Sequence, residues 1–356
     1  MSLLWCDKYR PKDFSKLDFH KEQGSGLKSL TKDGDFPHLL IYGPMGAGKK
    51  TRIMCILKEL YGPGVERLRS ETMSFTTPSN KKLEIGTVNS NYHIEVNPSD
   101  VGIYDRVVIM NIIKNVAQTQ QLDITGQKSF KVVVLTDVDA LTKDAQHALR
   151  RTMEKYISNC RLILCATSIS RVIPAIRSRC LCVRIPAPSA EEIVDIIKKT
   201  AALEDVALPD KLAERIAVLS ERNLRRALLM TEACKVESDG KLSPDQRISE
   251  PDWQIMIRET ARLIVKEQSI AQLKKVREHL YELICRGIPS EIIFKTLLDE
   301  LLQQCNLGLT AEILENAAHY EHQMVQGNKE IFHLEAFVAK CMYLYQNVLE
   351  EMKCDF

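Results

Sequence analysis

The sequence predicts an α/β nucleotide-binding domain with a mostly parallel sheet, followed by two helical regions. Three observations lead to this prediction. Up to about residue 186, short apolar runs alternate with amphipathic stretches, which is typical of a parallel sheet covered by helices. A glycine-rich turn at residues 43–50 follows one of these apolar runs and precedes a helical pattern. Beyond residue 251 apolar residues recur at helical spacing throughout.

The expected strands are short apolar runs, at residues 38–42, 92–96, 131–136, 161–166 and 181–185. The third run begins Lys131-Val-Val-Val-Leu135 and is apolar on both faces, as the central strand of a parallel sheet should be. A helix is expected at 51–61, directly after the glycine-rich turn. This order of strand, turn and helix is the context in which such a turn binds phosphate.

Pro186 and Pro188 break the chain after the last strand, and Ser189 with Glu192 forms a capping-box pattern at the start of the next helix. A polar, turn-rich linker at 237–251 separates two groups of helices. The expected helices lie at 189–202, 209–220, 223–236, 252–266, 270–286, 289–305, 309–326 and 330–350. We therefore expect domains at 1–186, 187–247 and 248–356.

Composition excludes several classes of protein. With 49 Lys and Arg against 47 Asp and Glu, the formal net charge is only +2, so any contact with nucleic acid must come from a local patch. The eleven cysteines include no Cys-x-x-Cys pair, which argues against zinc or a disulfide framework. No run of about eighteen apolar residues occurs, and the start of the chain lacks an apolar stretch, so we expect neither membrane insertion nor secretion.

The turn Gly43-Pro44-Met45-Gly46-Ala47-Gly48-Lys49-Lys50 fits a phosphate-binding loop at every position except the last. Its glycines, Gly43, Gly46 and Gly48, let backbone N–H groups surround phosphate oxygens, and Lys49 adds positive charge. Lys50 stands where a hydroxyl that ligates magnesium belongs, and shifting the register to use Thr51 would put Pro44 and Lys49 at glycine positions. The loop predicts nucleotide binding without efficient hydrolysis.

Several further motifs carry a resemblance to a known family. They are Trp5-Cys-Asp-Lys8-Tyr9-Arg10-Pro11, Glu95-Val-Asn97-Pro-Ser99-Asp100, Ala145-Gln-His-Ala148-Leu-Arg150-Arg151-Thr-Met-Glu154 and Ile176-Arg-Ser178-Arg179-Cys180. Over nearly its whole length the chain resembles the small subunits of replication factor C. Within that family it is most similar to the eukaryotic subunit-3 type, whose ATP site is degenerate.

The resemblance implies an AAA+ nucleotide-binding α/β domain, a small helical lid and an all-α C-terminal collar that joins subunits. It also implies a nuclear hetero-pentamer with other replication factor C subunits, active in DNA replication and repair. In this family the complex uses ATP to open a ring-shaped sliding clamp and close it on primer–template DNA, which it grips through phosphates. Any contact with DNA is therefore expected to come from a local patch and not from the net charge of the chain.

The family pattern assigns roles to individual residues. By resemblance, Trp5, Tyr9, Arg10 and Pro11 lie beside the adenine and phosphates of the bound nucleotide, and Arg225 leans onto it from the lid. Arg179 is the family's arginine finger, which acts in trans on the ATP of a neighbouring subunit. A planar guanidinium supplied across an interface would stabilise charge on the transferring phosphate.

Three positions depart from the family's hydrolytic pattern. Thr136 replaces the aspartate that supports the metal, Asp137 replaces the catalytic glutamate, and Thr167 replaces a sensor asparagine. With Lys50, these changes predict bound ATP or ADP, no protein ligand set for Mg²⁺, and weak or absent ATPase activity. Two alternatives stay open: an active ATPase whose metal site is rescued by Asp137 or Asp139, and a scaffold that binds no nucleotide.

Overall fold

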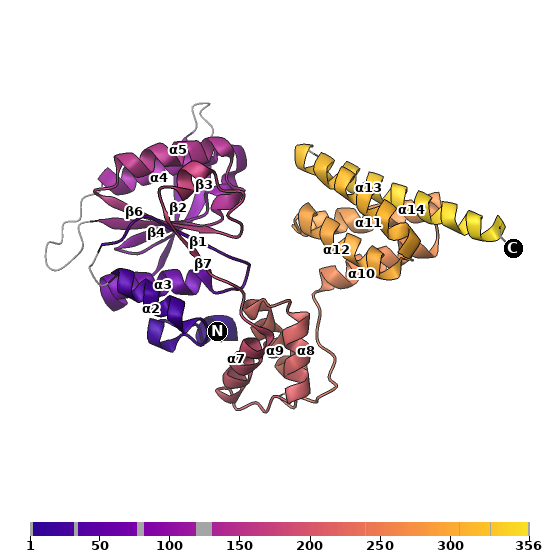
Figure 1. Cartoon of the computed structure of the whole chain (residues 1–356), viewed down its shortest axis with the longest axis horizontal. Helices are drawn as coiled ribbons and strands as arrows, with labels where there is room; N and C mark the ends of the chain where they lie inside the picture. Colours follow the sequence, from indigo (N-terminus) through magenta and orange to yellow (C-terminus); the bar gives the residue numbers. More distant parts are fainter. Residues whose placement is uncertain are drawn as a thin grey trace. The chain divides into compact units, whose positions relative to one another are not determined.

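The computed structural model describes residues 3–31, 35–76, 82–118, 130–238, 240–305, 307–327 and 329–354. The chain divides into two compact units, residues 1–248 and 249–356 (Figure 1). The first unit contains the sheet, the glycine-rich turn and the helices up to α9. The second contains α10 to α14. Each unit is described by itself below.

Within the described residues, a seven-stranded sheet forms the centre of the first unit. Its spatial order is β2 (Arg69–Thr76), β3 (Lys82–Asn89), β4 (His93–Val96), β5 (Lys131–Leu135), β6 (Cys160–Ala166), β1 (Leu39–Tyr42) and β7 (Leu181–Arg184). From β4 to β7 all neighbours pair in parallel, whereas β2 and β3 add as antiparallel strands at one edge. The predicted α/β fold with a mostly parallel sheet is confirmed. Because parallel strands end at the same edge, the residues that follow β1, β5 and β6 are brought together.

Helices cover both faces of this sheet (Figure 1). They are α2 (Lys21–Thr31) and α3 (Lys49–Tyr61) on one face, and α4 (Asp105–Gln118) and α5 (Lys143–Lys155) on the other. Strand β1 supplies both cores: Leu40 packs in one, and Leu39 and Ile41 pack in the other. Since successive side chains of a strand point to opposite faces, a strand buried on both faces must be apolar at every position.

The hairpin β2–β3 was not among the expected strands. In β2, Phe75 is the buried residue, and the segment Arg69-Ser-Glu-Thr72 is exposed. In β3, Leu83, Ile85 and Thr87 alternate with exposed residues. A hairpin at the edge of a sheet buries one face at most, so its apolar signal is weak and the sequence pattern does not reveal it.

Helices α7 (Ala190–Ala202), α8 (Asp210–Leu219) and α9 (Leu224–Glu237) share a small core of their own, and we call them the lid. The predicted capping box opens α7: Ser189 Oγ accepts a hydrogen bond from Glu192 N at 3.1 Å, and Ser189 N donates to Glu192 Oε2 at 2.8 Å. The short helix α1 (Trp5–Lys8) packs on α9. The first unit also contains α6 (Pro174–Arg177) and 3₁₀ turns at Phe14–Lys16, Gly62–Glu66, Pro98–Tyr104 and Val138–Ala140.

The second unit consists of helices, as predicted. They are α10 (Asp252–Lys266), α11 (Ile270–Cys285), α12 (Ser290–Gln304), α13 (Leu307–Gln326) and α14 (Glu330–Cys354). Phe294 and Phe337 are buried at the centre of its core with ring centroids 4.7 Å apart. Gly287 has φ +78° at the end of α11, a conformation in which glycine carries no steric penalty.

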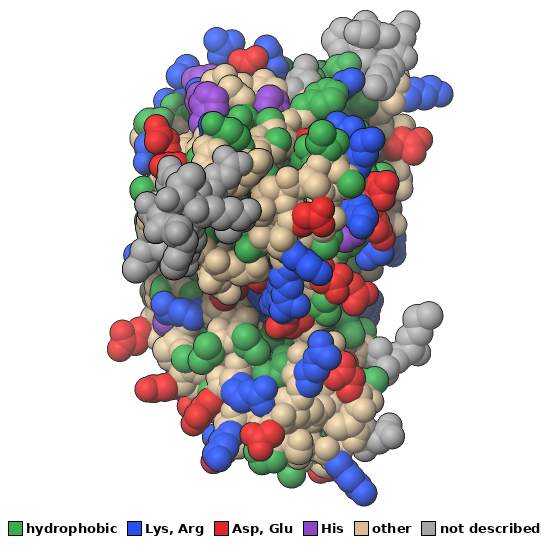
Figure 2. All heavy atoms as spheres, turned by 90° about the vertical axis from the view of Figure 1, so that its right-hand side faces the viewer, with side chains coloured by type: hydrophobic (Ala, Val, Ile, Leu, Met, Phe, Trp, Pro, Cys, Tyr) green, Lys and Arg blue, Asp and Glu red, His purple; other side chains and the backbone are tan. Residues whose placement is uncertain are grey.

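The surface agrees with the near-neutral net charge. On the face drawn in Figure 2, basic and acidic side chains are interspersed instead of gathering in one region of a single sign. Among the described residues, no helix is both long enough and apolar enough to cross a membrane. The ten cysteines from Cys6 to Cys341 are free thiols.

A buried histidine links the stability of the first unit to pH. Burial lowers the pKa of His93, which is 2% exposed, to about 4. The unfolded chain, with a histidine pKa near 6.5, therefore binds more protons as pH falls from 6.5 to 4, and folding loses stability in that window. We expect the free energy of unfolding to fall by about 2 kcal/mol between pH 7 and pH 5 on account of this side chain. Urea titrations of the wild type and His93→Gln at both pH values check this: the fall should be smaller by that amount in the variant, and equal falls would contradict it.

Candidate nucleotide-binding site

The glycine-rich turn lies between β1 and α3, as the sequence predicted. Gly46 and Gly48 have φ angles of +73° and +79°, which other residues rarely adopt. Gly43 is needed for a different reason: a Cβ there would lie 2.0 Å from the carbonyl oxygen of Ile185. The turn can therefore follow this path only with glycines at these positions, and it leads directly into the first turn of α3, whose N–H groups lack helical acceptors.

A cavity of about 1140 Å³ extends from this turn to the lid. Most of the residues expected at the nucleotide line it: Tyr9, Arg10, Pro11, Gly46, Gly48, Lys49, Lys50, Thr51, Asp137, Thr167 and Arg225. Gly43 shapes the turn from behind and is not part of the lining. Residues from the N-terminal segment, the sheet edge and the lid thus converge on one space.

The lining has more basic than acidic side chains. Among the described residues, nine Lys and Arg line the cavity against three acids, Asp18, Glu95 and Asp137. The basic residues are Lys8, Arg10, Lys12, Lys16, Lys49, Lys50, Arg52, Lys199 and Arg225. Lys49 Nζ donates to the carbonyl oxygens of Gly43 at 2.5 Å and Pro44 at 3.0 Å, and burial lowers its pKa. A positive concave site of this kind favours a polyanion such as the phosphates of a nucleotide.

Part of the cavity is apolar. Side chains from the N-terminal segment and from the lid line it, namely Pro11, Leu17, Phe19, Ile196, Leu203 and Leu228. A cavity with an apolar part and a basic turn suits a ligand with an aromatic base and phosphates. Of these side chains, the sequence analysis had singled out only Pro11, because isolated apolar residues carry no signal of which cavity they line.

The segment after β5 provides the acidic side of the site. Asp137, with φ +49°, lines the cavity, and burial together with the charge of Asp139 raises its pKa. Asp139 is committed elsewhere, since its carboxylate accepts hydrogen bonds from the backbone N–H groups of Thr167 and Ser168 and from the Thr167 hydroxyl. The Thr136 hydroxyl donates to the Val96 carbonyl oxygen at 3.3 Å.

Lys50 stands at the loop position where a hydroxyl that ligates magnesium was predicted to be missing, and it forms an ion pair there. Its Nζ lies 2.5 Å from Glu95 Oε1 at the end of β4. Mg²⁺ requires oxygen ligands at near-octahedral geometry, whereas position 50 offers an ammonium that occupies the nearby carboxylate. Among the described residues, no three His, Cys, Asp or Glu side chains cluster as a metal site. At position 50, the chemistry of the side chain therefore does not fit a ligand of Mg²⁺.

The N-terminal motif reaches the cavity only in part. Tyr9 donates from its hydroxyl to Glu204 Oε1 at 2.6 Å, and Arg10 pairs with Asp7 at 2.5 Å. Trp5 is not brought to the cavity. It is 4% exposed, donates from its backbone N to Glu232 at 3.0 Å, and has Lys235 Nζ 4.9 Å from its ring centroid. Its ring packs against α9, because α1 docks on the lid. The place of Trp5 beside the nucleotide stays a prediction.

The lid contacts the phosphate loop directly. Arg225 lines the cavity from the first turn of α9, whereas Arg226 does not and pairs with Glu221. Asn223, which caps α9 by accepting from Arg226 N, lies so close to Gly46 that a Cβ on Gly46 would meet its Oδ1 at 1.9 Å. Asn223 was not among the predicted site residues, although an asparagine before a helical pattern is a recognisable N-cap.

Arg179 lies on the surface, outside the cavity of its own chain. It donates from Nε to Glu154 Oε1 at 2.6 Å and from an NH group to the Ala175 carbonyl oxygen at 2.9 Å. An exposed guanidinium held by one surface carboxylate can change partners at little cost. This placement suits action on another molecule.

Comparisons with known proteins cover the whole chain. Residues 253–349 match the family described as "Replication factor C subunit 3, C-terminal domain", and residues 195–236 match "RCF1/5-like, AAA+ ATPase lid domain". Residues 20–189 match "DNA polymerase III, delta subunit". Replication factor C subunit 3 of Mus musculus is 59% identical over 348 residues, which cover 98% of both chains. The chain belongs to the replication factor C family. Replication factor C subunit 5 of Neurospora crassa is 49% identical over 349 residues, covering 98% of this chain and 99% of the other.

A solved structure extends the comparison at the level of fold. The Thermotoga maritima RuvB Holliday junction branch migration motor is similar with a TM-score of 0.52 and 17% sequence identity. The match covers 83% of this chain and 91% of that one. At this identity the likeness concerns the fold alone. It agrees with the AAA+ fold that the resemblance to replication factor C implied.

Proposed function

We propose that this chain is a subunit of an ATP-dependent clamp loader that binds ATP or ADP, hydrolyses it poorly and donates Arg179 to a neighbour's ATP. The observation that carries nucleotide binding is the glycine-rich turn at the base of a cavity with nine basic side chains and an apolar part. Membership of the replication factor C family supports the clamp-loader role, with other subunits of that family as partners. Nuclear location, the sliding clamp and primer–template DNA held by its phosphates belong to the same proposal.

Weak hydrolysis is supported by the side chains on the acidic side of the site. Hydrolysis requires a group that orients water and a metal ion that neutralises charge on the phosphates. Asp139 is held by Thr167 and Ser168, and Lys50 with Glu95 blocks the position of the metal support. These contacts oppose rescue of the metal site by Asp139. Asp137 lines the cavity, so the alternative of an active ATPase that uses Asp137 is decided by measuring hydrolysis. The positive cavity opposes the alternative of a scaffold without nucleotide.

Equilibrium binding of fluorescent ADP tests nucleotide binding and its independence from magnesium. We expect the dissociation constant to change by less than about threefold when excess chelator replaces Mg²⁺, because the charges that face the phosphates are the protein's own. Lys49→Ala should weaken binding about 10- to 100-fold, the value of one charge-assisted hydrogen bond. Lys211→Ala, an exposed lysine on α8, is the control. No binding by the wild type, or release of ADP by the chelator, would contradict the proposal.

Restoring the metal supports should create a dependence on magnesium. The double variant Lys50→Thr/Thr136→Asp removes the ammonium and supplies a hydroxyl and a carboxylate, which are oxygen ligands for Mg²⁺. We expect ADP to bind the double variant at least about tenfold more tightly with Mg²⁺ than with chelator, a difference of about 1.4 kcal/mol. The same titration on Lys50→Thr alone separates the loss of charge from the gain of a ligand. An unchanged response to Mg²⁺ in the double variant would show that the metal position is blocked for another reason.

A further inference from the structure

A fully buried arginine lies directly beneath the phosphate loop. Arg52, in the first turn of α3, is 0% exposed, and it is among the largest fully buried side chains of the described residues. Buried arginines are almost always paired with an acid. Among the described residues, no carboxylate lies within ion-pair distance of Arg52. Glu192 interacts with the charge of Arg52 only at longer range, and the Glu192 carboxylate accepts a hydrogen bond from the backbone N–H of Ser189.

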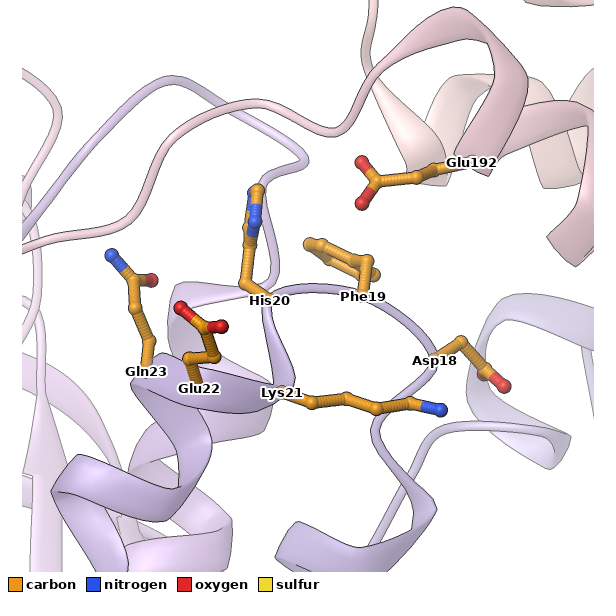
Figure 3. Close-up of a pocket in the computed structure, with 7 residues that line it drawn as sticks. All are labelled: Asp18, Phe19, His20, Lys21, Glu22, Gln23 and Glu192. Carbon is orange, nitrogen blue, oxygen red and sulfur yellow. The ribbon is translucent and has the colours of Figure 1, made fainter.

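The guanidinium is held by backbone carbonyl groups instead. One NH group donates to the carbonyl oxygens of Ala47 at 3.2 Å and Gly48 at 3.4 Å, and the other donates to Phe19 at 3.3 Å. The guanidinium carbon also lies 4.7 Å from the centroid of the Phe19 ring. Figure 3 shows Phe19 beside His20 on the segment before α2, with Glu192 reaching toward them from α7. Arg52 therefore joins the phosphate loop to the N-terminal segment that lines the same cavity.

The geometry of the peptide group gives these contacts a consequence. In a trans peptide, the C=O and N–H groups are planar and point in opposite directions. The guanidinium binds the carbonyl oxygen of Ala47, and it shares the carbonyl oxygen of Gly48 with the backbone N–H of Arg52, which donates at 3.2 Å. Both carbonyl groups point toward Arg52, so the N–H groups of Gly48 and Lys49 point away from it. N–H groups at this position of a glycine-rich loop are the ones that bind phosphate oxygens.

The charge of Arg52 has a consequence as well. A guanidinium stays protonated at every pH at which the protein folds. Burying this charge without a counter-ion is costly, and the three carbonyl groups offset only part of that cost. A phosphate anion bound by the loop would supply the missing negative charge through a short, poorly solvated path.

We propose that Arg52 is a positioning residue of the nucleotide site: it orients the Gly48 and Lys49 amides toward phosphate and contributes a permanent buried positive charge where magnesium supports are missing. This inference rests on the proposed nucleotide binding. It assigns to Arg52 part of the charge compensation that a metal ion gives in other phosphate-binding loops.

Two variants of the full chain test the proposal. Arg52→Met keeps a long side chain but removes the charge and the donors, whereas Arg52→Lys keeps the charge and loses the planar fork. With chelator present, we expect Arg52→Met to bind fluorescent ADP at least about tenfold more weakly than the wild type, and Arg52→Lys about threefold to tenfold more weakly. Lys58→Met removes a cation from the same helix, where it pairs with Glu66 and Asp13, and should leave ADP binding unchanged.

Hydrogen exchange of the nucleotide-free protein gives a readout that needs no ligand. Peptides covering the loop and the first turn of α3 should exchange faster in both Arg52 variants than in the wild type, and remain unchanged in Lys58→Met. If the wild type bound no ADP, the proposed function would fail, and exchange alone would decide whether Arg52 holds the loop. ADP affinity equal to wild type in folded Arg52→Lys, or unchanged exchange in both variants, would overturn the inference. If Arg52→Met does not fold, Arg52→Lys carries both tests.

Discussion

Replacing Arg179 by alanine is expected to slow ATP hydrolysis at the neighbouring subunit's site by about 10³-fold, the lower end of the range for an arginine finger. The side chain is exposed, and its guanidinium donates hydrogen bonds to Glu154, Ala175 and Ser178 on the surface of its own chain. Its removal should therefore leave folding and this chain's own ADP affinity unchanged. The amount of phosphate that the reconstituted complex releases in its first turnover, the phosphate burst, should fall by the amount that this one site contributes.

Two further variants make the result specific. Arg179→Lys keeps the charge without the planar fork and should recover only a small part of the burst, because a point charge cannot bind two phosphate oxygens in the same way. Glu154→Gln removes the carboxylate that holds Arg179 at 2.6 Å and should leave the burst intact. An unchanged burst in Arg179→Ala would remove this residue from the mechanism.

Gly46→Ala is expected to abolish nucleotide binding and to destabilise the first unit by about 2 kcal/mol or more. Two effects combine at this position. The φ angle of +73° is strained for alanine, and the added Cβ would lie 1.9 Å from Asn223 Oδ1, so either the Asn223 side chain must turn away and release its cap on α9 or the lid must shift. Thermal unfolding and ADP titration measure the two losses separately.

Two other glycines separate the effects of strain and collision. Gly62 has φ +75° and ψ −165° with open space around its Cβ position, so Gly62→Ala should show the cost of backbone strain alone, about 1–3 kcal/mol. Gly26 lies within α2 with open space and no positive φ, so Gly26→Ala should stabilise by about 0.5–1 kcal/mol. Both variants should bind ADP as the wild type does. If Gly46→Ala bound ADP normally, the contact between Asn223 and the loop would have no role in the site.

The fold was predictable wherever burial on both faces or helical spacing leaves a strong pattern. Strands β1, β5 and β6 are continuous apolar runs because helices cover both faces of the sheet. The hairpin β2–β3 was missed because an edge hairpin exposes most of its residues. Many of the cavity residues were predictable because their motifs follow the ends of parallel strands, which meet at one edge of the sheet.

The parts of the site that escaped prediction depend on contacts between distant segments. Trp5 belongs to a motif of the right type, yet its ring packs against α9 and away from the cavity, and no local pattern encodes that docking. The closeness of Asn223 to Gly46 and the burial of Arg52 under the loop arise in the same way. Lys50 was recognised as a lost metal support, but its partner Glu95 lies 45 residues away, on strand β4.

We propose above that this chain holds a nucleotide that it hydrolyses poorly. The most direct test is a single-turnover experiment in which the chain, in excess over radiolabelled ATP and with Mg²⁺ present, is quenched at increasing times. We expect the bound ATP to remain intact over many turnovers of the assembled complex, with Lys49→Ala as the control that fails to retain it. Conversion of the bound ATP to ADP at the rate of the assembled complex would contradict the claim.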